Sequence, residues 1–221
     1  MHKIFIDLEM HPVARAYSEP FKMLKKETIE IGAVMLDEQL REIASFKEYV
    51  RPSYSDKIYP KYQKLTGITT EMLKSADCFQ SVFKRFCDWC GQDYIIYSWS
   101  EDDIWQLMRE HQYKGIEYSK EIRYMFNHWK DFQAEFGSML NLKRQLSLAD
   151  AVLVGGLDFT GHAHDGLVDA RNTANLFRQT SNSGSDEFKR LLRNIEEARR
   201  PCTFSLREIV DFDQLLILQQ A

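Results

Sequence analysis

The chain opens with an alternation of apolar and acidic positions that is typical of a buried β-strand. Within residues 3–10, alternation puts Phe5, Asp7 and Glu9 on one face, because successive side chains of a strand point to opposite sides. The other face carries the apolar residues Ile4, Ile6 and Leu8. Apolar side chains on both faces favour a central, covered strand over an exposed edge strand with two solvated acids. Two neighbouring buried carboxylates repel each other, and a hard divalent cation would balance them.

Three further stretches have the composition of strands. Residues 27–36 and 41–50 are rich in β-branched and apolar residues and are separated by the polar turn 37–39, so we expect an antiparallel three-stranded start to the sheet. Residues 53–64 read as a Tyr- and Lys-rich connection, and residues 94–99 as another strand. That strand runs into Glu101, Asp102 and Asp103, at the point where open α/β sheets place their chemistry. Acids are also favoured in any first helical turn, so this cluster alone does not indicate a site.

The remaining pattern is helical. A stripe with helical spacing over 79–90 predicts a helix that Asp77 and Gln80 cap and Gly91 ends. Cys87 and Cys90 lie on its apolar stripe, and we interpret them as core residues because no second ligand pair accompanies them.

We expect further helices from about 104, over 119–136, from Ser147 to Gly155, and over 167–177. The last of these has a narrow stripe with two alanines, so it can lie close to the sheet with Asp169 facing inward. His164 precedes it in a glycine-flanked loop, whereas His162 reads as structural or solvated. Residues 181–185 read as a linker before an amphipathic helix and a second, apolar helix from Ser205 to Leu218.

Composition bounds the interpretation. A chain of 221 residues that is 44% hydrophobic can bury one sizeable core. No apolar run approaches the roughly 20 residues that span a bilayer, and four scattered cysteines do not make a disulfide framework, so we expect a soluble, cytoplasmic protein. A formal net charge of −4 gives no global attraction to nucleic acid, so a polyanionic partner would need a local basic patch or bound metal.

The ordered motifs resemble the DEDDh 3′-to-5′ exonuclease superfamily. Asp7 and Glu9 on the first strand, Asp103 opening a helix, and His164 five residues before Asp169 carry the resemblance. The stretches 29–34, 65–69, 98–99 and 169–174 are similar to the branch that contains ERI-1-type RNA exonucleases and KapD-like exonucleases. We choose Asp103 over its acidic neighbours because family members have Asp four residues before Leu, as in Asp103 and Leu107. Ala163 and Asp165 depart from what relatives often carry.

The resemblance implies a ribonuclease-H-like α/β fold, with a mixed central sheet flanked by helices, over residues 1–180, and a helical extension at 181–221 packed on it. It implies Mg²⁺ or Mn²⁺, two ions held by Asp7, Glu9, Asp103 and Asp169, with His164 as the general base. The expected substrate is the 3′ end of single-stranded RNA or DNA, with RNA preferred, cut to nucleoside 5′-monophosphates. Met10, Leu65, Thr66 and Trp99 are the expected substrate-binding residues, and the alternative interpretation is that they are ordinary core residues. The alternative is a nucleic-acid-binding or regulatory protein that keeps this fold without turnover.

Overall fold

The computed structural model describes residues 1–199. Its centre is a mixed six-stranded sheet with the strand order β4-β3-β2-β1-β5-β6. The strands are β1 (His2–Pro12), β2 (Lys26–Leu36), β3 (Glu42–Arg51), β4 (Asp77–Cys78), β5 (Tyr94–Ser98) and β6 (Trp129–Asp131). The expected antiparallel start is confirmed, because β2 pairs antiparallel with both β1 and β3, whereas β5 pairs parallel with β1.

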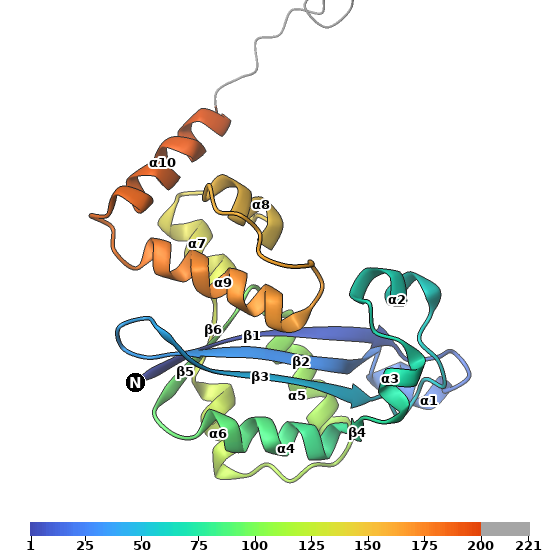
Figure 1. Cartoon of the computed structure of the whole chain (residues 1–221). Helices are drawn as coiled ribbons and strands as arrows, with labels where there is room; N and C mark the ends of the chain where they lie inside the picture. The colour runs from blue at the N-terminus through green and yellow to red at the C-terminus, as the bar shows by residue number, and fades with distance from the viewer. Residues whose placement is uncertain (200–221) are drawn as a thin grey trace, which may run out of the picture.

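Helices cover both faces of the sheet (Figure 1). On one face lie α4 (Phe79–Cys90), α5 (Asp102–Tyr113) and α6 (Lys120–Asn127), and on the other α7 (Phe132–Met139), α8 (Leu148–Val154) and α9 (Gly166–Thr180). Shorter helices are α1 (Ser18–Met23), α2 (Pro60–Thr66) and α3 (Thr70–Lys74). This is the expected α/β fold with a mixed sheet between helices.

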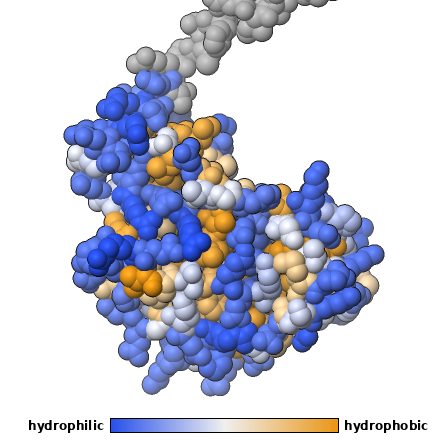
Figure 2. Space-filling view, in the orientation of Figure 1, coloured by the Kyte–Doolittle hydropathy of each residue, from blue (hydrophilic) through white to orange (hydrophobic). Residues whose placement is uncertain are grey.

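Each sheet face packs its own core, as the alternation in β1 predicts. Ile4, Ile6 and Leu8 pack with α4, α5 and α6, whereas Phe5 packs with α7, α8 and α9. Hydrophilic residues cover most of the surface in view, and apolar residues show there only in patches (Figure 2). Within residues 1–199 no helix is both long and apolar enough to span a bilayer.

For helix α4, the predicted core cysteines and C-terminal end are confirmed, whereas the predicted N-terminal cap is wrong. Cys90 is buried and Cys87 packs beside it on the core, and Gly91 follows the last helical residue. The capping box at Asp77 is wrong, because Asp77 pairs with Val50 as part of β4 and Cys78 holds the N-cap position without a side-chain cap. The Asp77 carboxylate instead lies 2.9 Å from Arg85.

Two other predictions need correction. Residues 119–136 are not one helix, since α6 ends at Asn127 and β6 adds a strand beside β5 before α7 begins. The connection at 53–64 runs into α2, which the composition did not indicate. The short helix after Ser147 is confirmed as α8, with the Ser147 hydroxyl accepting the Asp150 N–H and Gly155 at its end.

The C-terminal part follows the predicted linker. Helix α10 (Asp186–Arg199) packs Phe188, Leu191 and Ile195 into the same cluster as α8 and α9. The division of the chain at residue 180 stays a prediction. The expected helix from Ser205 to Leu218 lies outside the described residues.

Candidate active site

At the centre of the sheet, the start of α5 places Asp103 beside β1, the strand that carries Asp7 and Glu9. Strand β1 pairs with β5 only as far as Ile6 and Ser98, so the Leu8 N–H is left for another acceptor. That acceptor is Asp103 at the start of α5, whose Oδ1 lies 3.2 Å from the Leu8 nitrogen. Asp103 is 5% exposed, whereas Asp102 is an exposed residue. The helix therefore presents Asp103, and not its neighbour, to β1.

Two glycines let α9 begin directly on the sheet. A Cβ on Gly32 of β2 would lie 2.1 Å from the Gly166 carbonyl carbon, and a Cβ on Gly166 would lie 2.9 Å from the Asp7 carbonyl oxygen. Any larger residue at either position would push the helix off the sheet. This contact carries His164 and Asp169, at the start of the helix, to the carboxylates of β1.

We call Asp7, Glu9, Asp103 and Asp169 the acidic site. Burial, together with the nearby carboxylates, raises the pKa of Glu9 to about 9, and burial raises the pKa of Asp103 to about 7. Burial likewise raises the pKa of Asp169 to about 6, and burial with the charges of Asp103, Asp169 and Glu9 raises that of Asp7 well above its usual range. In the described part of the chain none of the four forms an ion pair with Lys or Arg. Ionising all four carboxyls would therefore place more negative charge in the site than its own residues balance.

The donor atoms fit a hard cation. One ligand atom each of Glu9, His164 and Asp169 lies within 4.8 Å of the others. The Asp169 Oδ2 accepts the His164 backbone N–H at 3.0 Å, whereas its Oδ1 is buried without a hydrogen-bond partner. A buried carboxylate oxygen without a partner is costly unless something absent from the polypeptide binds it. The acidic site is thus a possible metal site, open to solvent on the side of the exposed His164.

Glu30 is a fifth acid that the sequence reasoning missed. It lies opposite Glu9 in the β1–β2 ladder, is 1% exposed, and accepts the Gly166 N–H at 2.8 Å. Its Oε2 is 3.6 Å from Lys47, which also pairs with Asp165 at the N-cap of α9. Glu30 therefore holds the start of α9 in place. The available signal was a lone Glu within the apolar run of residues 29–36.

The predicted substrate-binding residues fall into different surroundings. Met10 is partly exposed directly after Glu9, and Leu65 is 38% exposed on α2. The Thr66 hydroxyl bonds locally, donating to the Tyr62 carbonyl and accepting the Ile68 N–H. Trp99 is 7% exposed, packs on Phe132 and Phe136 and donates to a main-chain carbonyl. Trp99 therefore stabilises the core and is not part of the substrate site that we propose. His162 is exposed, as expected.

Comparison with known families identifies the arrangement. The family model named RNase T and described as an exonuclease matches residues 4–177. The chain belongs to this family. Within the RNase T exonucleases the chain is of the DEDDh type.

Individual relatives of the RNase T family give the same result. The human protein "3′-5′ exoribonuclease 1" is 29% identical over 161 residues, which cover 68% of this chain and 45% of the relative. The chain thus spans under half the length of that curated relative. The nuclease domain of 3′hExo, titled a DEDDh family member bound to rAMP, is 25% identical and covers 83% of this chain and 92% of that one, with a TM-score of 0.71. The Mg²⁺- and Mn²⁺-bound form of S. pombe Pop2p has the same fold at 18% identity, 83% and 85% coverage and a TM-score of 0.58.

Proposed function

We propose that this protein is a metal-dependent 3′-to-5′ exonuclease that removes nucleoside 5′-monophosphates from single-stranded nucleic acid. The observation that carries the proposal is the acidic site. Ligand atoms of Glu9, His164 and Asp169 lie within 4.8 Å of one another, and a buried oxygen of Asp169 has no hydrogen-bond partner. The charges of Asp103, Asp169 and Glu9 all act on Asp7. The family to which the chain belongs supports the reaction class.

The carboxylates would hold two divalent cations, Mg²⁺ or Mn²⁺. Two such ions supply an activated water, in-line geometry and neutralisation of charge on the phosphorus. Asp7 lies near the other acids, since burial and then the charges of Asp103, Asp169 and Glu9 raise its pKa, and it would help to hold both ions. Asp103 accepts the Leu8 main-chain N–H and Asp169 accepts that of His164, and these two carboxylates would complete the ligand set.

His164 is the proposed general base. Its ring is exposed, and its nitrogen lies within 4.8 Å of the Glu9 and Asp169 oxygens, so it can take the proton from a water held between them. Its backbone has φ +66°, a conformation that turns the loop sharply before α9, and the hydrogen bond to Asp169 fixes it there. The neutral imidazole is the form that accepts the proton.

RNA is the proposed preference over DNA. Support comes from two relatives that are named exoribonucleases, and from the 3′hExo nuclease domain, whose structure has rAMP bound. On this chain Met10, Leu65 and Thr66 are the proposed contacts to the 3′-terminal nucleotide.

Digestion of a labelled oligonucleotide tests the proposal. A 5′-labelled, unstructured 12-nucleotide RNA should shorten stepwise in Mg²⁺ or Mn²⁺, and a 3′-phosphate should slow the reaction. The matched DNA should be cut more slowly. Internal cleavage, or full activity in EDTA, would contradict the mechanism, and faster cutting of DNA would contradict the preference.

A further inference from the structure

We propose that a groove beside the acidic site binds the sugar-phosphate backbone of the single strand upstream of the 3′-terminal nucleotide. This inference rests on the proposed function and assigns residues that the ordered motifs do not include. The groove lies between α5 and the segment that joins α1 to β2, and Met10 lines it between these two walls.

The groove starts where the acidic site ends. Met10 follows Glu9 on β1, and Asp102, which also lines the groove, precedes Asp103 on α5. Further along α5 the wall continues through Gln106 and Arg109, which lie four and seven residues after Asp102 and so on the same side of the helix. A strand whose 3′ end is held at the carboxylates can therefore continue into the groove.

The charge of the groove is opposite to that of the whole protein. Lys25, Lys26 and Arg109 line it against the single acid Asp102, whereas the chain carries a formal net charge of −4. All three cations are exposed, and within residues 1–199 none of them forms an ion pair. The Lys25 ammonium lies 4.0 Å above the Phe21 ring, which orders it without neutralising it. This is the local basic patch that a polyanion needs on an acidic protein.

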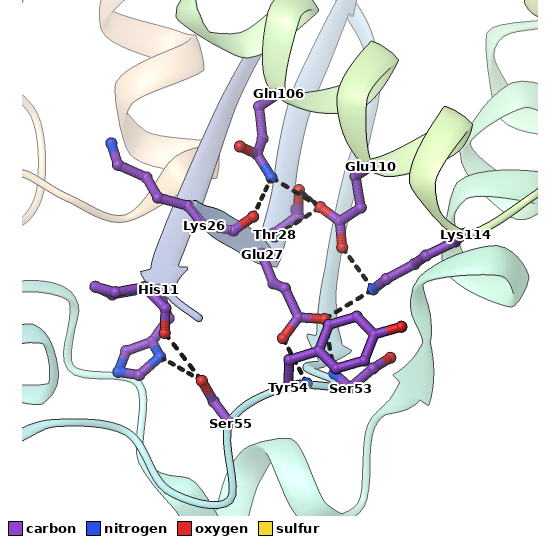
Figure 3. Close-up of polar contacts among 11 residues, drawn as sticks. His11, Lys26, Glu27, Thr28, Ser53, Tyr54, Ser55, Gln106, Glu110 and Lys114 are labelled. Carbon is purple, nitrogen blue, oxygen red and sulfur yellow. Dashed lines mark hydrogen bonds and ion pairs between the residues drawn. The ribbon is translucent and has the colours of Figure 1, made fainter. Parts of the chain in front are cut away.

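The two walls are fixed to each other (Figure 3). The Gln106 side-chain amide donates to the Lys26 carbonyl at 2.9 Å and to Glu110 at 2.9 Å. Glu110 in turn accepts the N–H and the hydroxyl of Thr28 at 2.9 and 2.8 Å. Figure 3 shows the Lys26 side chain extending away from these contacts, so its main chain is anchored while its ammonium is available. The groove is therefore formed before any ligand binds, which reduces the entropy lost on binding.

The occupant is a single strand and not a duplex. Met10 and Met23 add apolar surface among the cations, and Met23 is 70% exposed. Apolar side chains next to cations suit unpaired bases, whose faces are accessible, whereas a duplex offers mainly phosphates. Methionine is flexible and polarisable, so such contacts tolerate any base.

Binding to a 5′-fluorescein-labelled 12-nucleotide oligouridylate, measured by anisotropy in EDTA at low salt, tests the groove independently of turnover. The variant Lys25→Glu with Arg109→Glu should raise the Kd by at least about tenfold and reduce the slope of log K against log salt by about 0.7 for each phosphate that the variant no longer neutralises. The matched control is Lys120→Glu with Arg123→Glu, which makes the same change in net charge on α6. The ring of Tyr124, next to Arg123, packs on Tyr94 at the start of β5, at the end of the sheet away from Asp103, so this control should bind like the wild type.

Several outcomes would overturn the proposal. The first is no measurable binding by the wild type, and the second is an equal Kd for the groove variant and the wild type. The third is an equal loss of affinity in the groove variant and in the control variant. The fourth is a duplex that binds more tightly than the single strand and whose binding is abolished in the groove variant. Circular dichroism melting of each variant shows whether it is folded. Turnover separates this proposal from the general one, because the loss in kcat/KM of the groove variant should shrink from the 12-mer to a dinucleotide. A wild type that binds the strand through the groove but never cuts it would instead refute the proposed function alone.

Discussion

Two clusters of buried carboxylates lie within this fold, and they differ in how their charge is balanced. In the lysine-centred network, Glu27 of β2 and Glu110 of α5 share Lys114, whose ammonium lies 2.9 Å and 2.7 Å from them (Figure 3). Glu27 also accepts the N–H groups of Ser53 and Tyr54, both at 2.7 Å. Burial raises the pKa of Glu110, and the positive charge of Lys114 limits this rise. Burial lowers the pKa of Lys114, but the charges of the two glutamates outweigh it, so the pKa of Lys114 is raised.

Within residues 1–199 the acidic site has no lysine or arginine in ion-pair contact with its carboxylates. It receives two main-chain N–H groups, one at Asp103 and one at Asp169, and an oxygen of Asp169 is left without any donor. The comparison shows that this chain can place a cation and donors around buried acids where structure requires it. Buried acids that lack such partners are what a bound divalent cation requires, in agreement with the metal site that we propose.

The largest expected effect is the loss of exonuclease activity when a carboxylate of the acidic site is replaced. Asp7→Asn should lower exonuclease activity at least about 10³-fold, because the cations supply several kcal/mol of transition-state stabilisation. In EDTA the same variant should unfold with an unchanged or higher free energy, since it removes repulsion. Urea unfolding in EDTA measures this, and a clearly less stable variant would show that Asp7 is compensated within the chain.

In the lysine-centred network, by contrast, a substitution is expected to reduce stability. Lys114→Met leaves Glu27 and Glu110 buried without their cation and should reduce the free energy of unfolding by about 3–5 kcal/mol. The control Lys189→Met removes the exposed pair with Asp186 and should change it by less than about 1 kcal/mol. A loss at Lys114 no larger than that of the control would remove the contrast between the two clusters.

A smaller effect separates the base from the metal ligands. His164→Ala should lower turnover by about 10²-fold or more while Mn²⁺ affinity is nearly unchanged, because a general base contributes to the chemical step alone. His162→Ala, in the same loop and also exposed, should keep wild-type turnover. Equal turnover in all three proteins would require another base.

The last expected effect is the pH dependence of stability without metal. The pKa of Glu9 is raised to about 9 and that of Asp103 to about 7, so the folded state binds more protons than the unfolded state above about pH 4.5. Metal-free stability should therefore fall as pH rises from about 5 to 9, by several degrees in Tm. Mn²⁺ should remove this fall, since it replaces the protons. A Tm that rises over this range in EDTA would contradict the raised pKa values.

The sequence predicted the parts of the site that are local. Alternation was enough to place Asp7 and Glu9 on one strand face, and the alanine stripe was enough to bring Asp169 to the sheet. Strand β6 was missed because Trp129 continues the helical spacing of the residues before it, and three residues are too few to show a strand period. Asp77 was misread because a short strand paired with β3, a tertiary contact, took the place of the cap.

Contacts between distant residues that belong to no motif could not be predicted. Glu27 and Lys114 are 87 positions apart, and nothing local marks either as a member of a buried network. Glu30 and Gly166 are 136 positions apart, so the support that β2 gives to α9 became visible only in the fold.

The location of bound Mn²⁺ tests the central claim most directly. Crystals soaked in Mn²⁺ should give anomalous peaks bounded by Asp7, Glu9, Asp103 and Asp169, and none at Glu27 or Glu110, where Lys114 already balances the charge. Peaks only outside the acidic site, or no peak at saturating Mn²⁺, would contradict the account.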